Sequence, residues 1–166
     1  IIPPKSFIGH SMNYLRNYNY EFSKGKLKQT QTSYEEVIVI LSLLNSLTLN
    51  YYIRNKISAN LTMNFIYELP FPELTKKQKD YLTTAGLNLL ASYNEKKVFN
   101  KLFTECGFTP KIKINSIKIR AELELFIAKE IYGLTDEDWS NLTSTFIFGG
   151  DTETRKELTE IIELSL

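Results

Sequence analysis

Basic and amide side chains gather in two short stretches of the sequence, and these are its best candidates for chemistry. Lysines alternate with other residues in 24-KGKLK-28, and a polar series runs through 54-RNKISANLTMN-64. The candidate residues are Lys24, Lys26, Lys28, Arg54, Asn55, Lys56, Ser58, Asn60, Thr62 and Asn64. Lys and Arg neutralise phosphates with release of counterions, and Arg and Asn can contact base edges with two hydrogen bonds. The pattern therefore indicates binding to a nucleic acid.

A solvated surface without any ligand explains the same residues. Arg54 and Lys56 are predicted near the C-terminus of a helix, where a positive charge is favourable by itself. Asn60 is typical of a turn. On the residues alone, both interpretations stay open.

The side chains that enzymes use for catalysis are sparse. The sequence contains no phosphate-binding Walker loop, no G-x-G-x-x-G and no H-E-x-x-H, and its only His is His10. Cys106 is the only Cys, which excludes an internal disulfide and a Cys-based zinc cluster. Glu122, Glu124 and Glu130 are expected on the solvated face of a helix. We therefore expect no catalytic residue, bound cofactor or metal site in this chain, and a complete small enzyme is disfavoured.

The net charge of +1 conceals an asymmetry. Residues 1–120 contain 17 Lys and Arg against 8 Asp and Glu, a balance of +9. Residues 121–166 contain 3 against 11, a balance of −8. A basic body favours a polyanionic partner, although attraction between the two parts of the chain would also account for the pattern.

The N-terminal half combines strand and helix patterns. Residues 1–9 and the alternating 17–22 predict short strands, and 23–33 reads as an exposed loop. Ser33 and Glu36 form a capping box that opens a long, buried helix over 34–56. The alternating 61–69 predicts a half-buried strand that Pro70 and Pro72 close.

The remainder of the sequence is predicted to be helical. A second capping box at Thr75 and Gln78 opens a helix that runs to about 92. Further helices are expected over 94–106, which ends at Gly107, over 116–132, which ends at Gly133, from Thr135, and from 151 or 152 to the end.

These elements predict an α+β fold, with a small mixed or antiparallel sheet packed on the long buried helix. We expect an α+β part over 1–110 and a helical part over 111–166. The chain begins without Met at Ile1-Ile2-Pro3-Pro4, so we expect a fragment of a longer protein. No run of 18 or more apolar residues occurs, so we expect no membrane partner and a cytoplasmic location.

Three blocks of the sequence resemble a known family. The block 44-LNSLTLNYYIRNKISANLTMNFIYELPFP-72 is similar to L-N-S, an aromatic-rich helix, R-x-K-x-S-G and L-P-x-P. The block 119-IRAELELFIAKEIYGLTDEDWSNLTSTF-146 is similar to a closing block that contains R-A-E-L-D and Y-G-L-T. Together with the opening IIPPKSFIGHSMNYL, they resemble the C-terminal target-recognition region of type IIG restriction-modification adenine-N6 DNA methyltransferases and of related phage-defence methylases.

The resemblance implies a role in DNA recognition within an S-adenosylmethionine-dependent parent enzyme, which in type IIG enzymes also carries a nuclease. The Asn/Asp-Pro-Pro-Tyr/Phe motif of the methyltransferase domain is absent here. Catalysis and S-adenosylmethionine are thus expected in a missing N-terminal domain of the same chain, and double-stranded DNA is the expected partner. By the resemblance, the loop with Arg54, Lys56, Ser58, Asn60 and Asn64 faces the DNA.

Two positions depart from the family pattern. Ala59 stands where the family has Gly, which removes the conformational freedom that Gly provides for close backbone approach, and Glu124 stands where Asp is usual. The alternative function is a protein-interaction module, in which the acidic helices dock on another subunit and the basic face is solvated.

Overall fold

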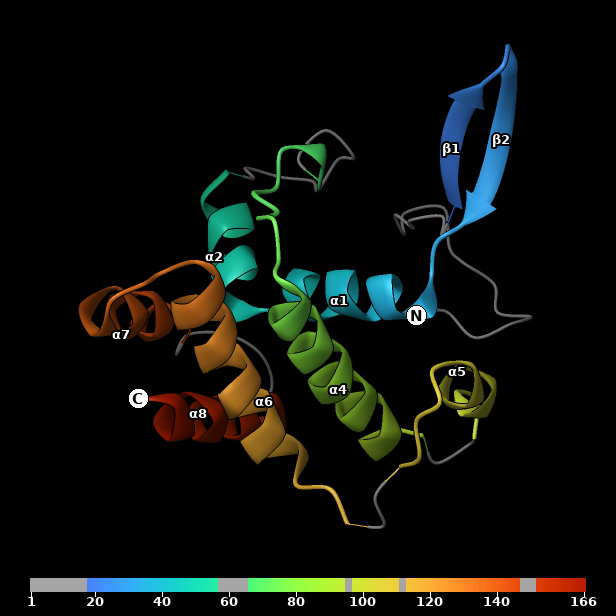
Figure 1. Cartoon of the computed structure of the whole chain (residues 1–166). Coiled ribbons are helices and arrows are strands. Elements are labelled where there is room, and N and C mark those ends of the chain that lie inside the picture. The colour runs from blue at the N-terminus through green and yellow to red at the C-terminus, as the bar shows by residue number, and fades with distance from the viewer. Residues whose placement is uncertain (1–17, 57–65, 95–96, 111–112, 147–151) are drawn as a thin grey trace.

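The computed structural model describes residues 18–56, 66–94, 97–110, 113–146 and 152–166, except for the side chains of 152–154. The fold is α+β, as predicted, with a two-stranded antiparallel sheet and a mainly helical C-terminal part (Figure 1). The strands are β1 (Tyr18–Ser23) and β2 (Lys26–Gln31). The helices are α1 (Tyr34–Leu44), α2 (Leu47–Lys56), α4 (Lys76–Ser92), α5 (Asn100–Glu105), α6 (Ser116–Phe126), the π-helical η1 (Ile127–Ile131), α7 (Asp136–Ser144) and α8 (Thr152–Ser165).

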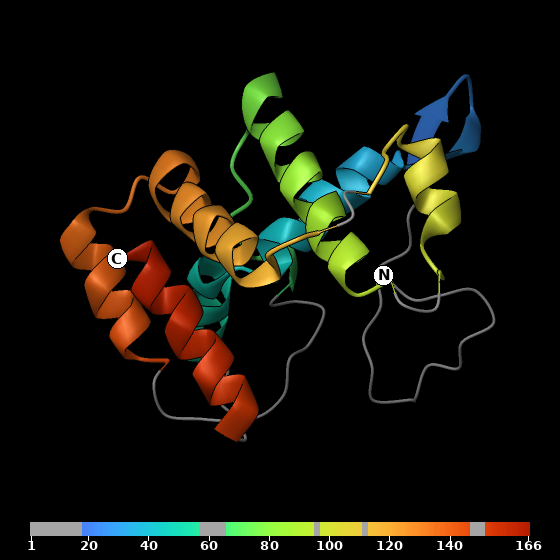
Figure 2. The same cartoon turned by 90° about the horizontal axis from the view of Figure 1, so that it is seen from below.

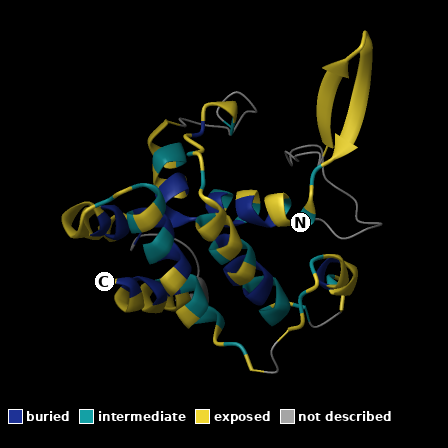
Figure 3. Cartoon of the chain, viewed as in Figure 1, coloured by how far each residue is buried: buried dark blue, intermediate teal, exposed yellow. Residues whose placement is uncertain are grey.

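The predicted strand at 17–22 is confirmed as β1, but the predicted loop at 23–33 is wrong because 26–31 form β2. The hairpin extends beyond the N-terminal end of α1 (Figures 1 and 2). All of its strand residues are exposed (Figure 3), so they do not lie on the helix that was expected to support the sheet. The strand predicted at 1–9 lies outside the described residues.

The long helix predicted over 34–56 is broken into α1 and α2, which are bent by 61°. The Ser33–Glu36 capping box opens α1 as predicted. At the break, Ser46 takes over as a cap, because its Oγ accepts a hydrogen bond of 3.2 Å from the Leu49 N–H. A side-chain oxygen that bonds an N–H three residues later is the usual way to start a helix.

The break is held from across the chain by α6. The buried Glu124 accepts a hydrogen bond of 2.7 Å from the Leu47 N–H and one of 2.6 Å from the Arg120 Nε. Arg120 also donates to the Asn45 carbonyl. Glu124 is therefore not on a solvated face as expected, since only 1% of it is exposed. The first N–H groups of a helix lack partners within the helix, and Glu124 supplies one for α2.

The strand predicted over 61–69 is wrong for its described end. Ile66 and Tyr67 are helical, and the Leu69 N–H donates to the Ile66 carbonyl, three residues earlier, at 3.3 Å. Tyr67 is exposed whereas Leu69 is buried, although alternation would place them on the same face. The Tyr132 hydroxyl donates to the Pro70 carbonyl at 3.0 Å, and burial raises the pKa of Tyr132 to about 12. Residues 61–65 lie outside the described residues.

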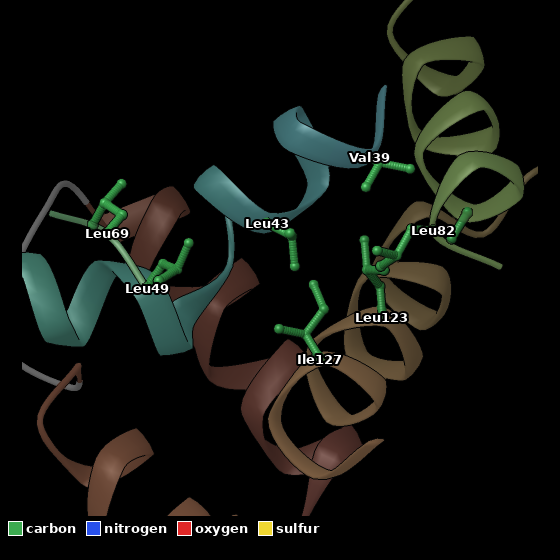
Figure 4. Packing of buried hydrophobic residues seen from close by; sticks show 8 residues of the cluster. Val39, Leu43, Leu49, Leu69, Leu82, Leu123 and Ile127 are labelled. Atoms are coloured by element: carbon green, nitrogen blue, oxygen red, sulfur yellow. The ribbon is translucent and has the colours of Figure 1, made fainter. Parts of the chain in front are cut away.

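The core joins helices from both predicted parts of the chain. Figure 4 shows one cluster in which α1, α2, α4, α6 and η1 meet. Its buried members are Val39, Leu43, Leu49, Leu69, Leu82, Ala85, Leu123 and Ile127. A second cluster is centred on Trp139, whose Nε1 donates to the Ser165 carbonyl and so ties α7 to α8. The boundary predicted at 110–111 stays a prediction, but the packing across it is extensive.

The other helix predictions hold with one change. The Thr75–Gln78 and Thr135–Asp138 boxes cap α4 and α7, and Gly107 and Gly133 have the positive φ values that end their segments. The helix predicted over 94–106 begins only at Asn100. Lys97, at φ 56°, lies in the left-handed region, which a helix cannot contain.

None of the described helices is both long and apolar enough to cross a membrane. Of these helices, only α1 and α2 counted together, as a bent pair, are long and apolar enough by length and composition. Both helices contribute to the core in Figure 4.

Gly86 lies where α1 and α4 approach closely, so we expect Gly86→Ala to lower the free energy of unfolding by about 1–3 kcal/mol. An added Cβ would lie 2.6 Å from Ile38 Cγ2 and 2.8 Å from Ser42 Oγ. Chemical denaturation measures the change, and Thr84→Ala on the exposed side of α4 is the control. An unchanged or higher stability would contradict the close contact of α1 with α4.

Arg120→Ala should lower the free energy of unfolding by about 2–3 kcal/mol at neutral pH. Burial raises the pKa of Glu124, while the charge of Arg120 and the hydrogen bonds from Arg120 and Leu47 oppose that rise. Without Arg120 the folded-state pKa rises further above its ordinary value of 4.5.

Between about pH 4.5 and the raised folded-state pKa, Glu124 is protonated in the folded variant but ionised in the unfolded variant. The free energy of unfolding of the variant therefore falls as the pH rises through this range. The loss should accordingly shrink in acid, as urea titrations at several pH values can measure. Lys118→Ala, which breaks the exposed pair with Glu122 on the same helix, should cost little at any pH. A loss for Arg120→Ala that did not depend on pH would contradict the role of the Glu124 charge.

Candidate nucleic-acid interface

The hairpin carries the first group of predicted residues. Lys24, at φ 51°, and Gly25, at φ 73°, form its two-residue turn. Two consecutive positive φ values are typical of a type I′ turn, whose twist suits a two-stranded ribbon. Lys26 and Lys28 follow on β2, opposite Ser23 and Glu21 respectively. The hairpin therefore presents three lysines at and next to its tip.

The two faces of the hairpin differ in chemistry. Residues that lie directly opposite in an antiparallel pair share a face, and successive residues alternate between faces. One face bears Lys26 and Lys28 together with Asn19, Glu21, Ser23 and Thr30. The other face bears Tyr18, Tyr20, Phe22, Leu27, Gln29 and Gln31. One side of the ribbon is thus polar and basic, and the other is aromatic with amide side chains.

The second predicted group lies at the C-terminal end of α2, where each described member has a partner within the chain. The Arg54 guanidinium lies 5.1 Å from the centre of the Phe146 ring. Asn55 donates to the Tyr51 carbonyl at 2.9 Å. Arg54 thus packs on Phe146, which follows α7, and Asn55 bonds within α2; both side chains are satisfied without any ligand, as the solvated-surface interpretation allows.

Lys56 has two neighbours of its own. Its Nζ lies 4.7 Å from the centre of the Tyr52 ring and 3.9 Å from a carboxylate oxygen of Glu68. Hydrogen bonding to Tyr52, and secondarily the charge of Glu68, raise the pKa of the Lys56 amine. Lys56 is therefore a stable positive charge at an exposed position, which suits phosphate but is partly balanced by Glu68.

Ser58, Asn60, Thr62 and Asn64, together with Ala59, lie outside the described residues. The two described groups are not brought together: the hairpin joins the N-terminal end of α1 and α2 follows its C-terminal end (Figure 1). An 11-residue helix separates its ends by about 16 Å. A ligand that touched both groups would therefore have to be extended, as a DNA duplex is.

Another basic cluster was not anticipated from the sequence. Lys76, Lys77 and Lys79 are exposed in the first turn of α4. No ion pair involves them in the part of the chain that the structure describes. The positive end of the helix dipole disfavours cations there, so an anion would relieve the repulsion. The signal in the sequence was a K-K-x-K run directly after the Thr75 cap.

A groove of about 1460 Å³ runs between α1, the segment 66–74 and the start of α4. Four carboxylates line it against two lysines: Glu35, Glu36, Glu73, Asp80, Lys76 and Lys79. This balance does not suit a polyanion, so the groove is not part of the candidate interface. Among the described residues, no three His, Cys, Asp or Glu side chains are grouped to hold a metal ion.

No protein-family model, curated protein or solved structure was found to match this chain. Its function is therefore inferred from the geometry and charge described above and from the resemblance in its sequence.

Gly25→Val should unfold the hairpin without unfolding the helices. A β-branched residue is strained in the left-handed region, by roughly 1–2 kcal/mol, and an isolated two-stranded hairpin is only marginally stable. NMR contacts between Tyr20 and Gln29 should be lost, while the helical circular dichroism stays unchanged. Gly25→Asn is the control, because Asn tolerates positive φ. Cross-strand contacts that survived in the Val variant would contradict the type I′ turn.

Proposed function

We propose that this chain is the DNA target-recognition region of an adenine-N6 DNA methyltransferase of the restriction-modification or phage-defence type. The observation that carries the proposal is the hairpin with Lys24, Lys26 and Lys28 at its exposed end. A two-stranded ribbon fits the major groove of B-DNA, which is about 12 Å wide and 8.5 Å deep. Six-residue strands are about 20 Å long, enough to reach the groove floor.

Charge supports DNA as the partner. The hairpin contains three lysines and one glutamate, and residues 1–120 as a whole carry an excess of positive charge. Phosphate contacts provide affinity and orientation, whereas contacts to base edges provide sequence choice. In this proposal the three lysines hold the backbone, and Arg54 and Lys56 are a second contact further along the duplex.

The proposal assigns catalysis to another part of the parent enzyme. S-adenosylmethionine and the methyl transfer belong to the missing N-terminal domain that the resemblance implies. The present chain positions the duplex so that the target adenine can leave the base stack and enter that domain, because an enzyme cannot reach the atoms of a stacked base.

A second candidate function is docking on another protein subunit. It is favoured by the end of α8, where Leu164 is 58% and Leu166 72% exposed beside Glu160 and Glu163. An exposed apolar end among carboxylates suits a basic, apolar protein surface and does not suit DNA.

Salt dependence distinguishes the two functions. We expect the chain to bind a mixed-sequence 30-base-pair duplex with an affinity that falls steeply as salt rises, as fluorescence anisotropy can measure. Substitution of Lys24, Lys26 and Lys28 by Ala should reduce the slope of log affinity against log salt by about 3.

The control is the triple Ala variant of Lys101, Lys118 and Lys156, which removes the same charge from α5, α6 and α8. Its slope should change much less. Equal slopes for the two triple variants would remove the hairpin from the interface, and absence of duplex binding by the unmodified chain at low salt would overturn the proposed function.

A further inference from the structure

The aromatic face of the hairpin has no partner within the part of the chain that the structure describes. Phe22 is 76% exposed and Leu27 65%, and Tyr20 and Tyr18 beside them are 53% and 42% exposed (Figure 3). A soluble hairpin normally presents such side chains to a core, since burying a large apolar side chain stabilises by roughly 1.5–3 kcal/mol. Four of them on one exposed face indicate a surface that becomes covered on binding.

The most exposed pair lies at the tip. Phe22 and Leu27 are directly opposite each other in the register, one pair before the turn. The next pair, Ser23 and Lys26, and the turn residues Lys24 and Gly25 complete the tip. An aromatic and an aliphatic side chain are therefore placed side by side next to the turn residue Lys24, at the end of the hairpin furthest from the helices (Figure 1), and Lys26 follows on the opposite face.

Charge complementarity selects the occupant of this surface. Lys24 in the turn next to the apolar pair, and Lys26 and Lys28 on the opposite face of the same ribbon, suit a ligand that is negatively charged outside and apolar inside. A nucleic-acid duplex has that arrangement, with phosphates around stacked bases. Proteins that kink DNA from the minor groove insert Phe or Leu between base pairs, while neighbouring basic residues hold the backbone. The same chemistry is proposed here for a ribbon in the major groove.

We propose that the Phe22–Leu27 pair is a wedge that enters a base step of duplex DNA and partly unstacks it. This inference rests on the proposed DNA-binding function and adds a mechanism to it: the hairpin deforms the duplex it binds. Lys24 and Lys26 hold the phosphates on either side of the opened step. Gln29, on the same face as the wedge, lies where its amide can meet a base edge.

Unwinding of closed circular DNA tests the wedge without knowledge of the target sequence. Relaxed plasmid is treated with topoisomerase while the chain is bound at saturation, and the protein is then removed. A side chain inserted into a base step unwinds the duplex, so the unmodified chain should leave the plasmid negatively supercoiled. Phe22→Thr and Leu27→Thr should abolish this change, and each should weaken duplex binding by about tenfold.

Threonine is chosen because it favours strands and so keeps the hairpin paired. Tyr93→Thr is the control, since Tyr93 is also highly exposed, at 65%, but ends α4. It should leave unwinding unchanged. If Tyr93→Thr abolished unwinding as fully as Phe22→Thr, the wedge would be overturned.

A second variant gives a signal that does not depend on loss of activity. Phe22→Trp places an indole at the tip, while the native Trp139 is only 1% exposed and provides a constant background. Stacking against bases should quench and blue-shift the new fluorescence on addition of plasmid DNA. Trp fluorescence that did not respond to bound DNA would overturn the wedge.

The outcomes separate the wedge from the function on which it rests. Duplex binding with an unchanged linking number overturns the wedge and leaves DNA recognition intact. Absence of duplex binding overturns the proposed function. If the aromatic face instead serves protein docking, Phe22→Thr will reduce capture of a protein partner and leave duplex binding unchanged, which also overturns the wedge.

Discussion

The carboxylate of Glu124 takes the place of a backbone carbonyl at the point where one continuous helix would otherwise run from α1 into α2. It accepts from the Leu47 N–H and is paired with Arg120, which itself bonds the Asn45 carbonyl. A buried charge is costly unless it is paired and hydrogen-bonded, and here both oxygens have a donor. The same contact sets the direction of α2 and joins it to the C-terminal helices, so the two predicted parts share one core.

The arrangement of the candidate interface follows from that break. Because α2 turns away from α1, its C-terminal end reaches the segment that follows α7, where Arg54 contacts Phe146. The hairpin remains at the other end of α1, where none of the described helices covers it (Figures 1 and 3). The helical core therefore separates the two basic elements of the candidate interface.

Local signals were sufficient for much of the fold. The capping boxes at Ser33 and Thr75, the helix start at Thr135, and the helix ends at Gly107 and Gly133 depend on residues within one turn of chain, and each was predicted correctly. The errors arose where distant residues decide. Alternation predicted a strand up to Leu69, but burial of Leu69 in the core and the Tyr132 contact at Pro70 favour a helical turn. β2 was missed because five of its six residues are polar, so it shows no alternation of apolar and polar residues. The available signal was the Lys24-Gly25 turn directly after the predicted strand. For the site, the lysine stretch was predicted, and alternation in the sequence put Tyr18, Tyr20 and Phe22 on one side of a strand. That Leu27 lies opposite Phe22 required the register.

By itself, the sequence determined that the chain is mainly helical, where its helices are capped, and which cations are available for a polyanion. These features depend on residue type and on neighbours within about four positions along the chain. Only the tertiary structure decided that Glu124 is buried and that the 34–56 helix is broken. It also decided that Phe22 and Leu27 meet beside Lys24 at an exposed tip. These facts depend on pairings between residues far apart in the chain or across strands, where packing and hydrogen-bond satisfaction override local preference.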